Sequence, residues 1–149
     1  TFTVNITITD AVDLWGWSCV VSWNPSIANC TKKQLGPFNP VGTSLLGVID
    51  NVNGRIPKLA AGTTEEDTVT GDGVLAILTF TGRAAGEVDL NVSEADYINY
   101  PSMDVFSLTA QQAEIIVLPE ISASLIIPLF LIATAAIALL TKRDRSRRP

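Results

Sequence analysis

The chain of 149 residues has no histidine, only two cysteines and a single methionine. The absence of histidine excludes the Ser-His-Asp triad, the Cys-His pair and every metal site built on imidazole. Carboxylates alone can support glycoside hydrolysis, but two of them must then face each other across a cleft. The acids of this chain gather instead in loops such as Glu65-Glu66-Asp67. We therefore expect a protein that is not an enzyme, with no catalytic residue, no metal and no cofactor.

Positive charge is scarce before the C-terminus. Residues 1 to 119 hold 13 acids and 5 bases, a net charge of −8. Nucleic-acid binding needs a basic surface, so this acidic part of the chain argues against a nucleic-acid partner. It is typical of a solvated surface that faces the outside of a cell.

One long apolar segment stands out against this background. Ile121 to Leu140 has twenty positions without a charge, which in a helix span about 30 Å, the thickness of a bilayer core. A basic tail follows, and basic flanks stay in the cytoplasm. The sequence therefore predicts an extracellular domain over 1–118, a linker at 119–120, a transmembrane helix over 121–141 and a cytoplasmic tail over 142–149. We expect a single-pass protein of the cell membrane, and the missing initial methionine indicates a processed or N-terminally incomplete chain.

Three sequons for N-glycosylation agree with an extracellular address. They begin at Asn5, Asn29 and Asn91, each followed two positions later by threonine or serine. Such triplets mark surface positions of secreted or membrane-displayed proteins. These three asparagines are our candidate glycosylation sites.

The two cysteines, Cys19 and Cys30, leave two interpretations open. A possible disulfide between them would close a short loop and contribute about 2.5 to 3 kcal/mol in an oxidising compartment. Alternatively, Cys19 is a small inward-facing residue of a strand, and the sheet sets the direction of its side chain.

The domain pattern is one of short strands. Phe2 to Thr9 alternate apolar and polar residues, a turn is expected at Asp10 to Asp13, and a second strand over Leu14 to Trp23 ends at Asn24-Pro25-Ser26. The remaining expected strands are 44–50 and 55–60, joined by a type I′ turn at Asn53-Gly54, then 73–81, 87–92, 106–109 and 113–118, with an acidic loop at 63–72. No segment before Pro119 has a helical period. The pattern predicts an all-β sandwich of eight or nine strands.

Two features invite a ligand-binding interpretation. Asp50 to Gly54 carries oxygen ligands spaced like part of a calcium loop, but the distal glutamate is absent because position 61 is alanine. A hairpin turn is the better interpretation. Trp15, Trp17 and Trp23 could stack on sugar rings, yet their shared spacing on one strand indicates that Trp17 and Trp23 face the core and leaves only Trp15 open.

Several segments of the domain resemble the cohesin domains of cellulosome scaffolds and their archaeal cell-surface relatives. The resemblance rests on residues 1–9, LWGWSCVVSWNPSIANCT (14–31), GPF (36–38), IDNVNGRI (49–56) and GDGVLAILTFTGRAAGEVDL (71–90). It implies a jelly-roll β-sandwich of about nine strands without catalytic activity that binds another module. In cellulosomes that module is a calcium-loaded dockerin, and related sandwiches bind polysaccharide. The C-terminal segment is similar to archaeal sorting signals, with Pro119-Glu120-Ile121 in place of the usual Pro-Glu-Phe.

The resemblance also suggests where a partner would bind. In cohesins the outward face of the sheet near residues 73–81 contacts the dockerin, so Leu75, Ile77 and Thr79 are our candidate contact residues. The alternative is that a loop or a neighbouring domain covers them. The sequence therefore predicts a membrane-anchored surface module that binds a dockerin-like protein or a polysaccharide. The alternative function is structural, as a subunit of a surface layer or filament that self-associates through its edge strands.

Overall fold

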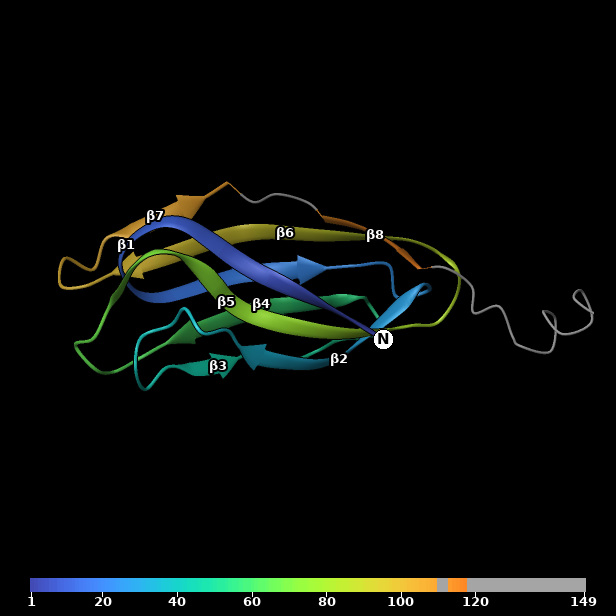
Figure 1. Cartoon of the computed structure of the whole chain (residues 1–149), viewed down its shortest axis with the longest axis horizontal. Coiled ribbons are helices and arrows are strands. Elements are labelled where there is room, and N and C mark those ends of the chain that lie inside the picture. The colour runs from blue at the N-terminus through green and yellow to red at the C-terminus, as the bar shows by residue number, and fades with distance from the viewer. Residues whose placement is uncertain (110–112, 118–149) are drawn as a thin grey trace, which may run out of the picture. The chain divides into compact units, whose positions relative to one another are not determined.

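Strand β1, Phe2–Ser22, organises the architecture because it belongs to both sheets. In the computed structural model, which describes residues 1–109 and 113–117, its first half pairs antiparallel with β5 (Val69–Gly82). Its second half lies between β4 (Arg55–Gly62) and β6 (Gly86–Asn99). Figure 1 shows β1 leaving the N-terminus, bending at the far end and returning along β6.

The bend in β1 replaces the turn that the sequence predicts at Asp10 to Asp13. Both aspartates have left-handed backbone, with φ of 54° and 49°, and the register with β5 shifts on either side of Ala11. Such bulges bend a strand without ending it. The prediction of two separate strands is therefore wrong here, and residues 2–22 form one bent strand.

The strands form two packed sheets. The smaller sheet has the order β2 (Ala28–Leu35), β5 and the first half of β1. The larger sheet runs from β3 (Ser44–Leu46) through β4 and the second half of β1 to β6. Two strands, β7 (Val105–Leu108) and β8 (Ala113–Val117), lie along β6 in succession (Figure 1). The described residues thus confirm the all-β prediction, with eight strands where about nine were expected.

The core lies between the sheets and is rich in aromatic side chains. Trp17 and Trp23 are each 5% exposed, which confirms that both face the core. Phe80 is fully buried and contacts Trp23 edge-on at 5.3 Å between ring centroids. Trp15 remains half-buried, stacked on Tyr100 at 6.4 Å. Burial of large aromatic surfaces of this kind dominates the stability of a small domain.

The predicted hairpin forms, with a different turn. Ser44 pairs with Gly62 and Leu46 with Ala60, and an isolated bridge joins Asp50 to Arg55. Gly54 has φ of 63° whereas Asn53 has no left-handed backbone, so the turn is not of type I′, which needs positive φ at both central residues. The acidic loop is also shorter than predicted, because β5 begins at Val69.

The predicted linker at 119–120, the transmembrane helix over 121–141 and the basic tail over 142–149 lie outside the described residues. Within residues 1–109 and 113–117, no helix has the length and apolar character needed to cross a membrane.

Candidate functional site

The predicted contact residues on β5 do not share one surface. Leu75 is 3% exposed and belongs to the core, so it does not lie on the outer face where the contact was predicted. The physical reason is a bulge: Ile6 pairs with Ala76 and Thr7 with Val74, which leaves Leu75 without a partner on β1. The carbonyl of Leu75 instead accepts hydrogen bonds from Gly36 N at 2.9 Å and Asn39 Nδ2 at 2.8 Å.

Ile77 and Thr79 lie on the outer face of the smaller sheet, which is polar. Directly paired residues share a face, so Ile77 lies in a row with Asn5 of β1 and Gln34 of β2. Thr79 lies in the next row, which is completed by Thr3 and Lys32. Within these rows Ile77 is the single large apolar residue, and it is half-buried. This face therefore presents little apolar surface to a partner.

Two of the candidate glycosylation sites lie on the same polar face. Asn5 is exposed beside Ile77, and Asn29 pairs with Thr81 at the end of β5. A glycan on Asn5 would cover the row that contains Ile77. The third site, Asn91, is half-buried and pairs with Ser22 in the larger sheet. Glycosylation at these positions stays a prediction, and it conflicts sterically with protein binding at Ile77.

The outer face of the larger sheet is different, because small and apolar residues line it. One row runs Ser44, Gly62, Gly16, Ile98, Val105, and the next runs Leu46, Ala60, Ser18, Asp96, Ser107. The centre is flat because its residues are small, with Gly62 and Gly16 in one row and Ala60 and Ser18 in the next. Leu46 and Val105 border this flat centre on opposite sides and are 64% and 63% exposed.

We call these two rows the β3–β6 face. Exposed apolar residues around a flat centre are typical of a surface that packs against another protein. Asp96 is its one charged member, and it lies between two serines. Sequence reasoning missed Leu46 and Val105 because each lies in a very short strand. Their exposure depends on which strands flank them, and no local pattern reports that.

The two cysteines are free thiols, which corrects the possible disulfide. They pair with different strands: Cys19 lies opposite Leu59 of β4, whereas Cys30 lies opposite Phe80 of β5. Both are buried, and burial raises the pKa of Cys19 to about 12. Burial also raises the pKa of Cys30. Both thiols are therefore protonated at neutral pH and act as small core residues.

In the hairpin turn at Asp50 to Gly54, the carboxylate of Asp50 is hydrogen-bonded within the turn itself. Asp50 accepts hydrogen bonds from the backbone amides of Val52 and Asn53 and from Asn53 Nδ2, the last at 2.7 Å. The Asn53 amides are the main cause that lowers the pKa of Asp50. Among the residues that the structure describes, no three acidic or cysteine side chains gather closely enough to hold a metal ion. The turn thus acts as a structural element.

The comparisons with known proteins identify the fold. No protein-family model and no curated protein matches the sequence. The non-cellulosomal cohesin of the archaeon Archaeoglobus fulgidus has a TM-score of 0.63 and 13% identity, over 83% of this chain and 84% of its own. A cohesin of Acetivibrio cellulolyticus in complex with a dockerin has a TM-score of 0.63 and 14% identity, over 79% and 89%.

A third similar structure is the cohesin module from a family 33 glycoside hydrolase of Clostridium perfringens. Its TM-score is 0.58 at 8% identity, over 70% of this chain and 73% of its own. At such low identities the likeness concerns the fold and says nothing about shared residues at a site. The chain has a cohesin-like all-β fold.

Proposed function

We propose that this chain is a non-catalytic recognition module that binds a protein module of the dockerin type through the β3–β6 face. The observation that carries this proposal is the exposed pair Leu46 and Val105 on either side of a flat centre of glycine, serine and alanine. Exposed apolar side chains beside a flat centre let a partner approach closely and bury apolar surface. A dockerin is the partner of the cohesin from Acetivibrio cellulolyticus that shares the fold.

Polysaccharide is the weaker candidate ligand. A sugar platform needs accessible aromatic faces, and two of the three tryptophans are buried. The third, Trp15, donates its indole N–H to the carbonyl of Glu65 at 2.8 Å and stacks on Tyr100. Its ring is thereby fixed in the wall of the domain, which favours a structural role.

The test compares the two outer faces by isothermal titration calorimetry. We expect the full chain to bind at least one of a panel of calcium-loaded dockerin modules. Leu46→Asp and Val105→Asp place a charge in the β3–β6 face and should each weaken binding at least about tenfold. Ile77→Asp is the matched control on the polar face and should leave affinity within about twofold. Loss of binding only in Ile77→Asp would assign recognition to the smaller sheet instead.

We further propose that the module is displayed on a membrane by the apolar segment 121–141. The support is the run of twenty uncharged residues followed by five bases in residues 142–149. Protease added to intact cells should cleave the domain and spare an epitope placed after Pro149. Cleavage of that epitope in intact cells, or recovery of the chain in the fraction without membranes, would contradict the anchor and leave the recognition proposal in place.

A further inference from the structure

The two sheets have unequal widths, and the smaller one stops at β1. Over Phe2 to Thr9, β1 pairs with β5 along one edge. None of the described strands pairs with its other edge, whereas the second half of the same strand has partners on both sides. Among the described strands, the first half of β1 is thus an edge strand, and no described strand pairs with the backbone N–H and C=O groups of that edge.

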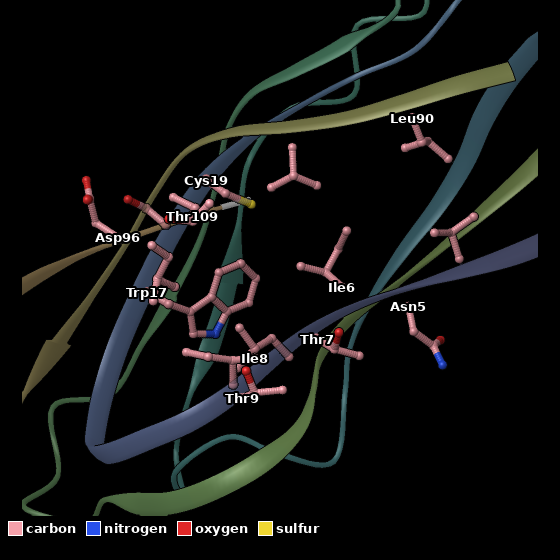
Figure 2. Close-up of a pocket in the computed structure, with 16 residues that line it drawn as sticks. Asn5, Ile6, Thr7, Ile8, Thr9, Trp17, Cys19, Leu90, Asp96 and Thr109 are labelled. Atoms are coloured by element: carbon pink, nitrogen blue, oxygen red, sulfur yellow. The ribbon is translucent and has the colours of Figure 1, made fainter. Parts of the chain in front are cut away.

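A cavity of about 290 Å³ lies along this free edge. Six consecutive β1 residues, Val4 to Thr9, line it. Successive side chains of a strand point to opposite faces, so six in a row can border one cavity only if the strand's backbone edge forms its rim. Figure 2 shows this part of β1 on one side of the cavity and β6, with Leu90, on the other.

The walls of the cavity are mainly apolar. Ile6, Ile8, Trp17, Leu75 and Leu90 all line it and are all less than 9% exposed. Such side chains offer water no hydrogen bonds, so its polar partners would come only from the β1 backbone edge and the polar lining residues. The chemistry of the walls favours aliphatic side chains as its content.

An inward-facing aromatic residue next to the cavity is also uncovered. Trp17 pairs with Tyr97, and Tyr97 pairs with Phe106 of β7, so the three side chains point to the same side of the larger sheet. Trp17 and Tyr97 are buried, but Phe106 is 41% exposed although it stacks on Tyr97 at 4.8 Å. No described strand of the smaller sheet covers Phe106. A further strand beside β1 would cover it.

The free edge lacks the charged and proline residues that commonly protect an edge strand against pairing. Natural edge strands carry lysine, proline or other devices that block a second chain. Residues 2–9 contain no charged residue and no proline. An open, uncharged edge above an apolar cavity fits strand addition, in which backbone hydrogen bonds give affinity and pockets accept alternate side chains.

We propose that the free edge of β1 binds an extended segment of a partner protein as an added strand. Its alternate aliphatic side chains fill the cavity and cover Phe106. The segment carries lysine or arginine near its ends, because residues 86–117, which form the neighbouring strands, hold six acids and no base. This site lies on the inner side of the larger sheet, whereas the β3–β6 face is its outer side, although Ser18 and Asp96 border both.

A second copy of this chain is a poorer occupant. Its β1 has Ile6 and Ile8 already packed in its own core. The edge of its β2 is occupied at Cys30, where Asn51 bonds both the backbone N–H and C=O. Two copies would also bring their acidic strands together. The partner segment is therefore one that is not already part of a folded sheet.

The experiment uses the full chain in mild detergent and a synthetic peptide of about nine residues. The peptide alternates valine with threonine and has a lysine at each end; its control has the same composition with the valines adjacent. We expect the alternating peptide to slow hydrogen exchange at alternate amides of Phe2 to Thr9, and to bind at least tenfold more tightly than the control. Methylation of the peptide nitrogens that face β1 should abolish binding, whereas methylation of the others should not.

A pair of protein variants locates the bound peptide. Ala95→Phe fills the cavity and should weaken peptide binding at least tenfold, whereas Ala84→Phe makes the same change on an exposed turn and should not. The methylated peptides also test whether the peptide pairs with the edge of β1, and they require no change to the protein. The proposal is overturned if the β1 amides that point away from β5 are already protected without peptide, since the chain itself then covers the edge. Protection that grows with protein concentration, or no protection at all, overturns it equally.

Discussion

The two edge strands of the smaller sheet differ in how they meet solvent. At β2, Asn51 donates to the carbonyl of Cys30 and accepts from its N–H, both at 2.8 Å, and Lys32 and Lys33 follow directly. Residues 2–9 of β1 have no charge and no proline, their edge away from β5 has no described partner strand, and a cavity lies beside that edge. One edge is protected by the chain itself. The other retains the properties of a binding site.

This difference explains how a sandwich can be stable and still able to bind a strand. Edge protection is a general requirement, since unpaired strands promote aggregation. By protecting one edge of the smaller sheet with a side chain and leaving the other open, the protein restricts strand pairing to one edge of that sheet. The following predictions test that contrast from the largest expected effect to the smallest.

Removing the side chain that closes β2 should cost the most stability. Asn51→Ala leaves the N–H and C=O of the buried Cys30 without their partner, so we expect the free energy of unfolding to fall by about 2 to 4 kcal/mol. Urea denaturation measures it. Asn53→Ala, in the same turn, is the control and should cost less than about 1 kcal/mol, because Asn53 bonds only Asp50 among the described side chains. Equal losses in both variants would mean that Asn51 does not protect the edge.

High pH should reveal whether the cavity beside β1 is dry. The thiol of Cys19 lines that cavity, and burial raises its pKa from 9.0 to about 12. Because the pKa is raised in the folded state, the stability from the protonated thiol is complete below pH 9 and is lost as the pH rises toward 12. We expect a loss of about 2 kcal/mol by pH 10.5.

The comparison variant for that titration is Cys19→Ala. Its free energy of unfolding, measured by denaturation at pH 8, 9 and 10.5, should fall less than that of the unaltered chain. Parallel curves for the two proteins would show that water reaches Cys19 and that the cavity is wet.

The smallest stability effect concerns the lysines of β2. Lys32→Thr with Lys33→Thr should change the free energy of unfolding by less than about 1 kcal/mol, because Lys32 is exposed and Lys33 loses a single hydrogen bond, from Nζ to the carbonyl of Leu45 at 3.3 Å. The double variant should nevertheless self-associate more, as seen by light scattering. Lys58→Thr on the interior strand β4 is the control and should not. If both proteins stay monomeric, the lysines do not protect the edge.

The alternation of side chains let the sequence predict much of the fold. Phe2 to Thr9 and the strand at 73–81 follow the period of two, and the shared spacing of Trp17 and Trp23 placed both in the core. Hydrophobic alternation reports which face is buried, and burial of that face is the largest favourable term in folding.

The errors in the sequence reading have a common cause in register. A bulge adds one residue to one strand, and it turned Leu75 from the predicted surface into the core. Two further register shifts, between Ile8 and Leu14, bend β1 without ending it, so the two predicted strands form one. The β3–β6 face and the cavity could not be predicted from the sequence, because each is formed by residues that are distant from one another along the chain.

The position of β1 in both sheets has a consequence for biosynthesis. β1 is made first, yet its partners β4, β5 and β6 begin at residues 55, 69 and 86. Its first segment is an uncharged strand-forming sequence. This segment stays unpaired until more than half of the domain has left the ribosome. Newly made chains of this protein are most vulnerable to aggregation during that interval, and a chaperone that binds extended apolar segments would find its target in residues 2–9.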